Sequence, residues 1–198
     1  MSAGILALVP IRSFESGKSR LSSRLDGEQR RDLTVTLAGG VVGVLAGIDH
    51  VDVVVVTSDD EVARWARDHR IVVLAPLLPG LNNAAAFGLS EAADRGYRHA
   101  AIVHADLAYP EGLAGLIDAV VEGDDDTLWI AADAVEDGSN VVVVPTSAAE
   151  RFVFGYGPGS CEAHVNAAFD AGVAVRRWFG GGLEVDIDTD ADLTHLDR

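Results

Sequence analysis

A short basic segment near the start of the chain is the first candidate for chemistry. It carries Arg12, Lys18 and Arg20 around Gly17, in a protein whose formal net charge is −16. Lys18 is the single lysine among the 15 basic side chains. A compact ammonium group in a tight, glycine-bearing loop suits phosphate oxygens, which the backbone N–H groups of such a loop also bind. The segment therefore predicts a polyphosphate site, and a solvated basic loop is the alternative.

Two carboxylates form the second candidate. Asp106 follows the apolar run 100–104, and Asp188 follows the run 183–187. If both runs are strands of one parallel sheet, their carboxyl ends meet at the edge where α/β proteins bind ligands. Carboxylates that meet there repel each other unless a cation lies between them, and Mg²⁺ takes one or two carboxylates together with phosphate oxygens. Asp106 and Asp188 are therefore predicted Mg²⁺ ligands, with helix or turn capping as the alternative.

A glycine-rich run is the third candidate. Three glycines alternate with other residues over 155–159, and Ser160 follows at the start of a predicted helix. Such a run lets the backbone approach a ligand closely, and a hydroxyl group at a helix start can bind phosphate or carboxylate. Ser139 lies in a second polar turn, 136–140. The alternatives are a plain turn with a capping serine at Ser160 and an ordinary hairpin turn at 136–140.

The apolar pattern predicts the elements that position these candidates. Strands are predicted at 5–11, 51–57, 71–74, 100–104, 127–132, 141–144, 173–177 and 183–187. Helices are predicted at 27–46, 62–69, 84–95, 110–121 and 161–171. The first eight elements alternate between strand and helix, which favours a mostly parallel sheet covered by helices on both faces. The sequence shows no linker or repeat, so we expect one α/β domain over 1–198.

Composition excludes several classes of partner. Asp and Glu outnumber Lys and Arg by 31 to 15, so nucleic acid and anionic membrane surfaces would be repelled. A chain with one cysteine forms no internal disulfide, which fits the cytoplasm. No apolar run reaches the roughly 18 residues of a membrane helix, and residues 1–21 lack the features of a signal peptide. The apolar residues of 33–45 would permit a homodimer.

Six motifs in chain order resemble the 2-phospho-L-lactate / phosphoenolpyruvate guanylyltransferase family of coenzyme F420 biosynthesis. They are VPIRSFESGKSRL at 9–21, PGLNNA at 79–84, HADL at 104–107, DGSN at 137–140, YGPGS at 156–160 with His164, and DIDTDADL at 186–193. The resemblance covers nearly the whole chain, and three positions depart from the family pattern. Arg12 stands where the family usually has lysine, Ser139 replaces threonine, and Ala108 and Tyr109 separate HADL from Pro110.

The resemblance implies a three-layer nucleotidyltransferase fold with a mostly parallel central sheet, similar to that of nucleotide-diphospho-sugar transferases. It also implies a reaction in which a phosphate oxygen of a phosphorylated three-carbon acid attacks the α-phosphorus of GTP and pyrophosphate leaves. The implied roles are catalysis for Lys18, Arg12 and Arg20, nucleotide binding for Pro10, Lys18, Gly80, Leu81, Asn82 and Asn83, acid binding for Ser139, Gly157 and Ser160, and Mg²⁺ binding for Asp106 and Asp188. Handover of the product to the downstream F420 transferase is a further implication.

The identity of the acid depends on the branch of the family. The composition, rich in Arg, Ala, Gly, Asp and Val, resembles the actinobacterial branch, for which phosphoenolpyruvate is the expected substrate. Archaeal relatives are associated with 2-phospho-L-lactate, and some branches use 3-phosphoglycerate. Two other functions stay open, namely another enzyme of the same fold, such as a molybdenum-cofactor or sugar nucleotidyltransferase, and a non-catalytic nucleotide-binding paralog. The former typically opens with a glycine-rich loop, whereas residues 12–20 contain Gly17 alone.

Overall fold

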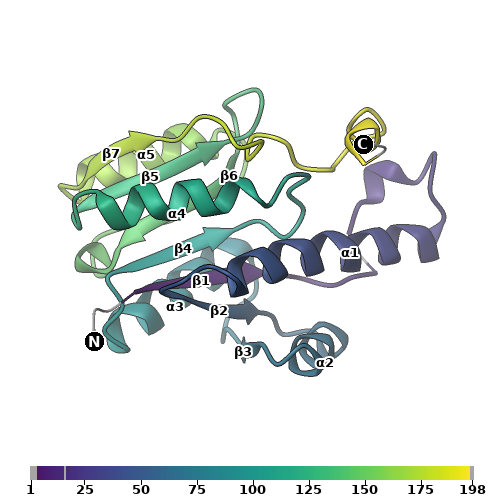
Figure 1. Cartoon of the computed structure of the whole chain (residues 1–198), viewed down its shortest axis with the longest axis horizontal. Coiled ribbons are helices and arrows are strands. Elements are labelled where there is room, and N and C mark those ends of the chain that lie inside the picture. The colour runs from purple at the N-terminus through teal and green to yellow at the C-terminus, as the bar shows by residue number, and fades with distance from the viewer. Residues whose placement is uncertain (1–3, 16, 197–198) are drawn as a thin grey trace.

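The computed structural model describes residues 4–15 and 17–196, and the ends of the predicted domain 1–198 lie outside this part. Its centre is a seven-stranded sheet with the strand order β3-β2-β1-β4-β6-β5-β7 (Figure 1). The strands are β1 (Ile5–Pro10), β2 (Val51–Val56), β3 (Val72–Leu74), β4 (His99–Val103), β5 (Thr127–Ala132), β6 (Ser139–Pro145) and β7 (Ala174–Arg177). β6 runs antiparallel to β4 and β5, and the other neighbouring pairs are parallel. The mostly parallel sheet is thereby confirmed.

Helices cover both faces of the sheet. They are α1 (Gly27–Ala46), α2 (Asp60–Asp68), α3 (Leu81–Asp94), α4 (Gly112–Glu122) and α5 (Ser160–Asp170). Ile5, Ala7 and Val9 of β1 pack into one core with α1, α2 and α4, whereas Leu6 and Leu8 pack into the other with α3 and α5. A strand buried on both faces needs a continuous apolar run, which β1 provides. The result is the three-layer architecture of the predicted fold class (Figure 1).

The long helix α1 begins at a capping box and packs one face into the core. Asp26 and Gln29 each accept a hydrogen bond from the other's backbone N–H group, which satisfies two donors at the helix start. Leu37, Val41 and Leu45 of the same helix are buried. The apolar face that suggested a homodimer therefore packs into the core of this chain. A homodimer stays a prediction, but this face no longer supports it. In the described part of the chain, no helix is long and apolar enough to cross a membrane.

The predicted strand at 183–187 is wrong. The segment lies across the strand ends, along the chain that follows β4, and does not join the sheet as a strand. Its backbone contacts there are an isolated bridge between Asp186 and Leu107, a hydrogen bond from the Ala108 N–H to the Val185 carbonyl (2.9 Å) and one from the Ile187 N–H to the Asp106 carbonyl (3.0 Å). Leu183 and Ile187 are buried where the segment crosses the strand ends. The apolar pattern therefore comes from this burial and not from a place in the sheet.

A close backbone contact holds the C-terminal segment against the start of α4. A Cβ atom on Gly112 would lie 2.2 Å from the carbonyl oxygen of Gly181, and a Cβ atom on Gly181 would lie 2.8 Å from the Cα atom of Gly112. Glycine is therefore required at both positions. Leu183, two residues after Gly181, is also held in place. Its carbonyl accepts a hydrogen bond from the side-chain amide of Asn140 at 3.0 Å. These contacts set the path by which the chain reaches Asp188.

Replacement of Gly112 by alanine is expected to destabilise the protein by about 1–3 kcal/mol, the usual cost of overpacking, because the added methyl group would meet backbone atoms. Gly43→Ala is the matched control, since Gly43 lies inside α1 with nothing within 4 Å of an added Cβ atom. It is expected to stabilise the protein by up to about 1 kcal/mol through helix propensity. Urea denaturation measures both free energies of unfolding. Equal stability of wild type and Gly112→Ala would contradict the close contact.

Candidate active site

A cavity of about 310 Å³ lies at the carboxyl ends of β1 and β4. Its walls come from the loop after β1, the chain after β4 and the C-terminal segment, with contributions from α1 and α3. The lining includes six of the residues predicted from the sequence, namely Pro10, Arg12, Lys18, Leu81, Asp106 and Asp188. The cavity therefore brings the expected polyphosphate loop and the expected metal ligands together.

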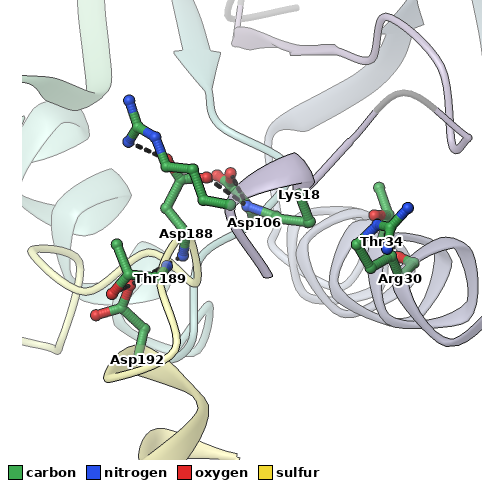
Figure 2. Close-up of polar contacts among 8 residues, drawn as sticks. Lys18, Arg30, Thr34, Asp106, Asp188, Thr189 and Asp192 are labelled. Atoms are coloured by element: carbon green, nitrogen blue, oxygen red, sulfur yellow. Dashed lines mark hydrogen bonds and ion pairs between the residues drawn. The ribbon is translucent and has the colours of Figure 1, made fainter. Parts of the chain in front are cut away.

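Lys18 links the basic loop to the carboxylates (Figure 2). Its Nζ atom donates hydrogen bonds to Asp106 Oδ2 at 2.5 Å and to Asp188 Oδ1 at 3.3 Å, and its side chain is 4% exposed. The backbone of Lys18 has a φ of 58°, in the left-handed region that costs a residue other than glycine on the order of 1 kcal/mol or more. The chain accepts this local strain at a residue whose ammonium group is held between two carboxylates. A solvated basic loop would not require that arrangement.

Three carboxylates gather around that ammonium group. One oxygen atom from each of Asp106, Asp186 and Asp188 lies within 4.8 Å of the others. Burial, together with the charges of Asp106 and Asp188, raises the pKa of Asp186. Asp106 Oδ1 is buried and has no hydrogen-bond partner among the described residues. One ammonium group does not neutralise three carboxylates, so the cluster fits a divalent cation that prefers oxygen ligands.

The turn after Asp188 fixes the position of that carboxylate (Figure 2). Asp192 Oδ2 accepts hydrogen bonds from the backbone N–H groups of Asp188 (3.0 Å) and Thr189 (2.6 Å), and from Thr189 Oγ1 (2.8 Å). Partial burial acts to raise the pKa of Asp192, but the hydrogen bonds from Thr189 and Asp188 outweigh it and lower that pKa below its usual value. Asp192 therefore organises the turn as a carboxylate, while Asp188 faces the cavity.

The two arginines predicted to assist Lys18 are placed differently from each other. Arg20 is 73% exposed and donates a hydrogen bond to Asp188 Oδ2 at 3.0 Å. Arg12 is exposed and lines the cavity itself. Arg20 thus adds positive charge to the carboxylate cluster, whereas Arg12 faces the space in which an anionic ligand would lie. Their catalytic roles stay predictions.

The predicted nucleotide-binding residues lie at the start of α3. Gly80 precedes the helix with a φ of 103°, and Leu81 lines the cavity. Asn83 donates a side-chain hydrogen bond to the carbonyl of the residue four positions earlier, at 2.7 Å. Asn82 instead pairs with the backbone of Tyr156, in a distant part of the sequence. Leu81 therefore lines the cavity with Gly80 directly before it, while the Asn82 side chain has a partner that the sequence did not indicate.

The predicted acid-binding serines lie together in the other half of the sheet. Ser139 is the first residue of β6 rather than a turn residue, and Ser160 is the first residue of α5. Ser160 Oγ donates to Ser139 Oγ at 3.4 Å, and Ser139 Oγ lies 3.0 Å from His164 Nδ1. All three residues are buried, whereas Gly157 is exposed in the preceding loop with a φ of 139°. The structure brings the serines together without exposing them to the 310 Å³ cavity.

His164 makes this half of the site uncharged. Burial, and to a smaller extent the charge of His104, lowers the pKa of His164 to about 4. Its ring packs among aromatic neighbours, with centroid distances of 4.6 Å to Tyr156, 5.9 Å to Phe154 and 6.2 Å to Phe152. A neutral imidazole and two hydroxyl groups can hydrogen bond to an anion without adding charge. The contrast with the ion cluster around Lys18 divides the candidate site into a charged half and a neutral half.

Two features of the site were not assigned from the sequence. Asp186 joins the carboxylate cluster, and its spacing carried the signal, because residues two apart in an extended segment point to the same side. The pairing of Asn82 with Tyr156 carried no signal, because the partners are 74 residues apart and one of them contributes only backbone atoms. The place of Asp186 in the cluster could have been predicted from the sequence, whereas the pairing of Asn82 with Tyr156 becomes visible only in the fold.

Known proteins are similar to this chain over most of its length. A family model described as "Guanylyl transferase CofC like" matches residues 5–196. A phosphoenolpyruvate guanylyltransferase of Sphaerobacter thermophilus is 34% identical over 194 residues, covering 96% of this chain and 91% of the relative. A 2-phospho-L-lactate guanylyltransferase of Methanocaldococcus jannaschii is 30% identical over 98 residues, covering 48% of this chain and 42% of the relative. The solved structure of a nucleotidyl transferase from Methanothermobacter has a TM-score of 0.62 at 16% identity, covers 98% of this chain and 95% of that structure, and confirms the fold.

The lowered pKa of His164 predicts a loss of stability in mild acid. In the unfolded chain a histidine has a pKa of about 6.5, so below that pH the unfolded state binds a proton that the folded state takes up only near pH 4. His164 makes its full contribution to the free energy of unfolding above about pH 6.5. This contribution declines as the pH falls towards 4, by about 3 kcal/mol in total. Urea denaturation across this range measures the effect. His164→Phe should flatten the profile, and an unchanged profile would contradict the buried neutral imidazole.

Proposed function

The chain belongs to the family of CofC-like guanylyl transferases, and on this premise we propose that it transfers GMP from GTP to phosphoenolpyruvate. The products would be enolpyruvyl-diphospho-guanosine and pyrophosphate, and the reaction would serve coenzyme F420 biosynthesis. The observation that carries the proposal is the ion cluster in which Lys18 contacts both Asp106 and Asp188. It combines, at one wall of one cavity, a cation for phosphate oxygens and carboxylates for a metal ion.

The proposed reaction is a displacement at phosphorus. A phosphate oxygen of phosphoenolpyruvate forms a bond to the α-phosphorus of GTP, while the bond from that phosphorus to the α,β-bridging oxygen breaks and its electron pair leaves with pyrophosphate. The phosphate of the acid is itself the nucleophile, so no side chain has to form a covalent bond. Lys18 would donate to phosphate oxygens as negative charge grows on the leaving group, with Arg12 and Arg20 adding positive charge nearby.

Asp106 and Asp188 would hold Mg²⁺, and Asp186 offers a third oxygen donor beside them. The fit is supported by the buried Asp106 oxygen that lacks a partner among the described residues, and by the like charges that, after burial, raise the pKa of Asp186. When bound, Mg²⁺ would supply positive charge that neutralises phosphate oxygens and helps to orient them for in-line attack. Lys18 offsets part of the carboxylate charge.

Phosphoenolpyruvate is the proposed acid because relatives that match nearly the whole chain carry its name, whereas the 2-phospho-L-lactate enzyme matches about half of it. The acid would meet the uncharged half of the site, where Ser139, Gly157 and Ser160 are the proposed contacts. Hydroxyl and backbone N–H groups distinguish similar acids through hydrogen bonds that one of them fails to make. 2-Phospho-L-lactate and 3-phosphoglycerate are the alternative acids. The complete ion cluster favours an enzyme over a non-catalytic nucleotide-binding protein.

The nucleotide would lie along the wall formed by Pro10, Lys18 and Leu81, beside Gly80. Pro10 ends β1 and Gly80 precedes α3, so both are backbone positions at the carboxyl edge of the sheet. A cytoplasmic location follows from the proposed substrates and fits a single cysteine, which is buried. Handover of the product to the next transferase would follow from the same place in the reaction sequence.

Purified protein incubated with Mg²⁺, GTP and one of the three acids tests the proposal. We expect pyrophosphate release with phosphoenolpyruvate, slower release with 2-phospho-L-lactate and 3-phosphoglycerate, and none with GTP alone. Asp106→Asn protein is the control for contaminating activity, because it loses a charged metal ligand and keeps the side-chain shape. GTP binding without turnover on any of the three acids would reject the proposal in favour of a nucleotide-binding protein.

Lys18→Ala is expected to lower kcat by roughly 10²-fold or more, as is typical when one charge-stabilising donor is lost. Arg24→Ala is the matched control from the same loop, since its side chain is 71% exposed and 3.7 Å from Asp190, and exposed ion pairs contribute little. The rate of pyrophosphate release at saturating substrate measures both effects. Wild-type turnover by the Lys18 variant would mean that the loop is a solvated surface.

A further inference from the structure

The side-chain amide of Asn82 is oriented by the backbone of a single distant residue. Its Oδ1 atom accepts a hydrogen bond from the N–H group of Tyr156 at 2.7 Å, and its Nδ2 atom donates to the carbonyl of Tyr156 at 3.3 Å. An amide that pairs with both polar groups of one residue fixes the position and the orientation of that peptide segment, as a neighbouring strand would. We refer to this contact as the Asn82–Tyr156 pair.

The Asn82–Tyr156 pair joins the two halves of the sheet. Asn82 lies in the first turn of α3, which packs against β1 and β4. Tyr156 lies in the loop before α5, and α5 packs against β5 and β7 (Figure 1). The first half carries Lys18 and the proposed nucleotide wall, and the second carries the proposed acid contacts. The pair therefore sets the position of the acid side relative to the nucleotide side.

The loop that carries Tyr156 continues through two glycines with positive φ values. Gly157 and Gly159 have φ values of 139° and 73°, and neither would meet another atom within 4 Å if a Cβ atom were added. Glycine positions of this kind are conformationally permissive, so the loop depends on contacts from outside to keep one shape. The Asn82–Tyr156 pair supplies such a contact at the residue directly before Gly157, which is one of the proposed acid contacts.

The ring of Tyr156 connects the Asn82–Tyr156 pair to the buried polar groups. It packs against His164 with 4.6 Å between ring centroids, and His164 Nδ1 is 3.0 Å from Ser139 Oγ. Ser139 in turn accepts from Ser160 at 3.4 Å. A shift of Tyr156 would therefore disturb both serines as well as Gly157.

From these contacts we propose that Asn82 is a positioning residue for the phosphorylated acid and not a contact for the nucleotide. It holds Tyr156 and Gly157 where the acid needs them, across the boundary between the two halves of the sheet. The inference rests on the proposed function for the identity of the acid. It reassigns a side chain that the sequence motif had grouped with the nucleotide-binding residues.

Asn82→Ala tests the inference, with Asn166→Ala as the matched control. Asn166 is also an exposed asparagine in a helix, α5, but it belongs neither to the proposed site nor to the Asn82–Tyr156 pair. Two neutral hydrogen bonds of ordinary net strength correspond to about a tenfold change in affinity. Calorimetry on the Mg²⁺-containing protein should therefore show about tenfold weaker binding of phosphoenolpyruvate to the Asn82 variant, and GTP binding within about twofold of wild type. The Asn166 variant should bind phosphoenolpyruvate like wild type.

Steady-state kinetics should give the same division. The KM for phosphoenolpyruvate should rise about tenfold in the Asn82 variant, with kcat within about threefold, because a positioning contact for one substrate acts on its binding. GTP binding weakened as much as acid binding, an equal rise in the Asn166 variant, or unchanged acid affinity would each overturn the inference. Wild type that binds both substrates without releasing pyrophosphate would reject the proposed function alone, since the binding comparison does not require turnover.

Hydrogen exchange tests whether the variant acts through the loop. Amides of 155–159 should exchange faster in the Asn82 variant than in wild type or the Asn166 variant, because the N–H of Tyr156 loses its acceptor. Asn82 and Asn166 are exposed, so both variants are expected to fold normally. Unchanged exchange in this loop would overturn the inference even if acid binding were weakened.

Discussion

Three like charges held within 4.8 Å of one another are the constraint on which the site depends. Two carboxylates at that separation repel each other by roughly 3 kcal/mol at the effective dielectric constant of a protein surface. The contacts of Lys18 with Asp106 and Asp188 offset part of this repulsion. Lys18 and Arg20 together bring two positive charges to three carboxylates, so the cluster keeps excess negative charge, and this excess makes it suitable for a divalent cation.

Carboxylates that repel one another would turn away into solvent unless the backbone held them, so the C-terminal segment is as important as the charges. Its path is fixed by the backbone contact of Gly112 with Gly181, by hydrogen bonds to the chain after β4, and by the turn that Asp192 organises. Gly112, Gly181 and Asp192 do not line the cavity, so residues outside it position the carboxylates. The contacts that stabilise the fold thus hold Asp106 and Asp188 at a fixed separation, which a metal site requires.

The sequence was sufficient to predict elements that have a regular apolar pattern. It was not sufficient for elements whose polar side chains have partners far away in the sequence. β1 and α1 were predictable because an apolar run and an apolar stripe specify them. The start of β6 was not, since Ser139 and Asn140 resemble a turn, yet they enter the strand with His164 and the Leu183 carbonyl as partners. The residues of 183–187 have a strand-like pattern, but they cross the strand ends. At the site, the basic loop and the acidic strand ends were predictable from charge, whereas the Asn82–Tyr156 pair depends on the fold.

The division of the site into a charged and a neutral half has a consequence for a protein with a net charge of −16. Both proposed substrates are anions that the acidic surface repels, and at physiological salt this repulsion and the attraction by the local cations both act within a Debye length of about 8 Å. A substrate that arrives with a bound divalent cation carries less negative charge and brings the ion that the carboxylates require. The neutral half, around His164, would then need only hydrogen bonds to hold the second anion, because the bound divalent cation and Lys18 would supply the positive charge. The acidic surface thus favours metal-bound substrates over the free anions.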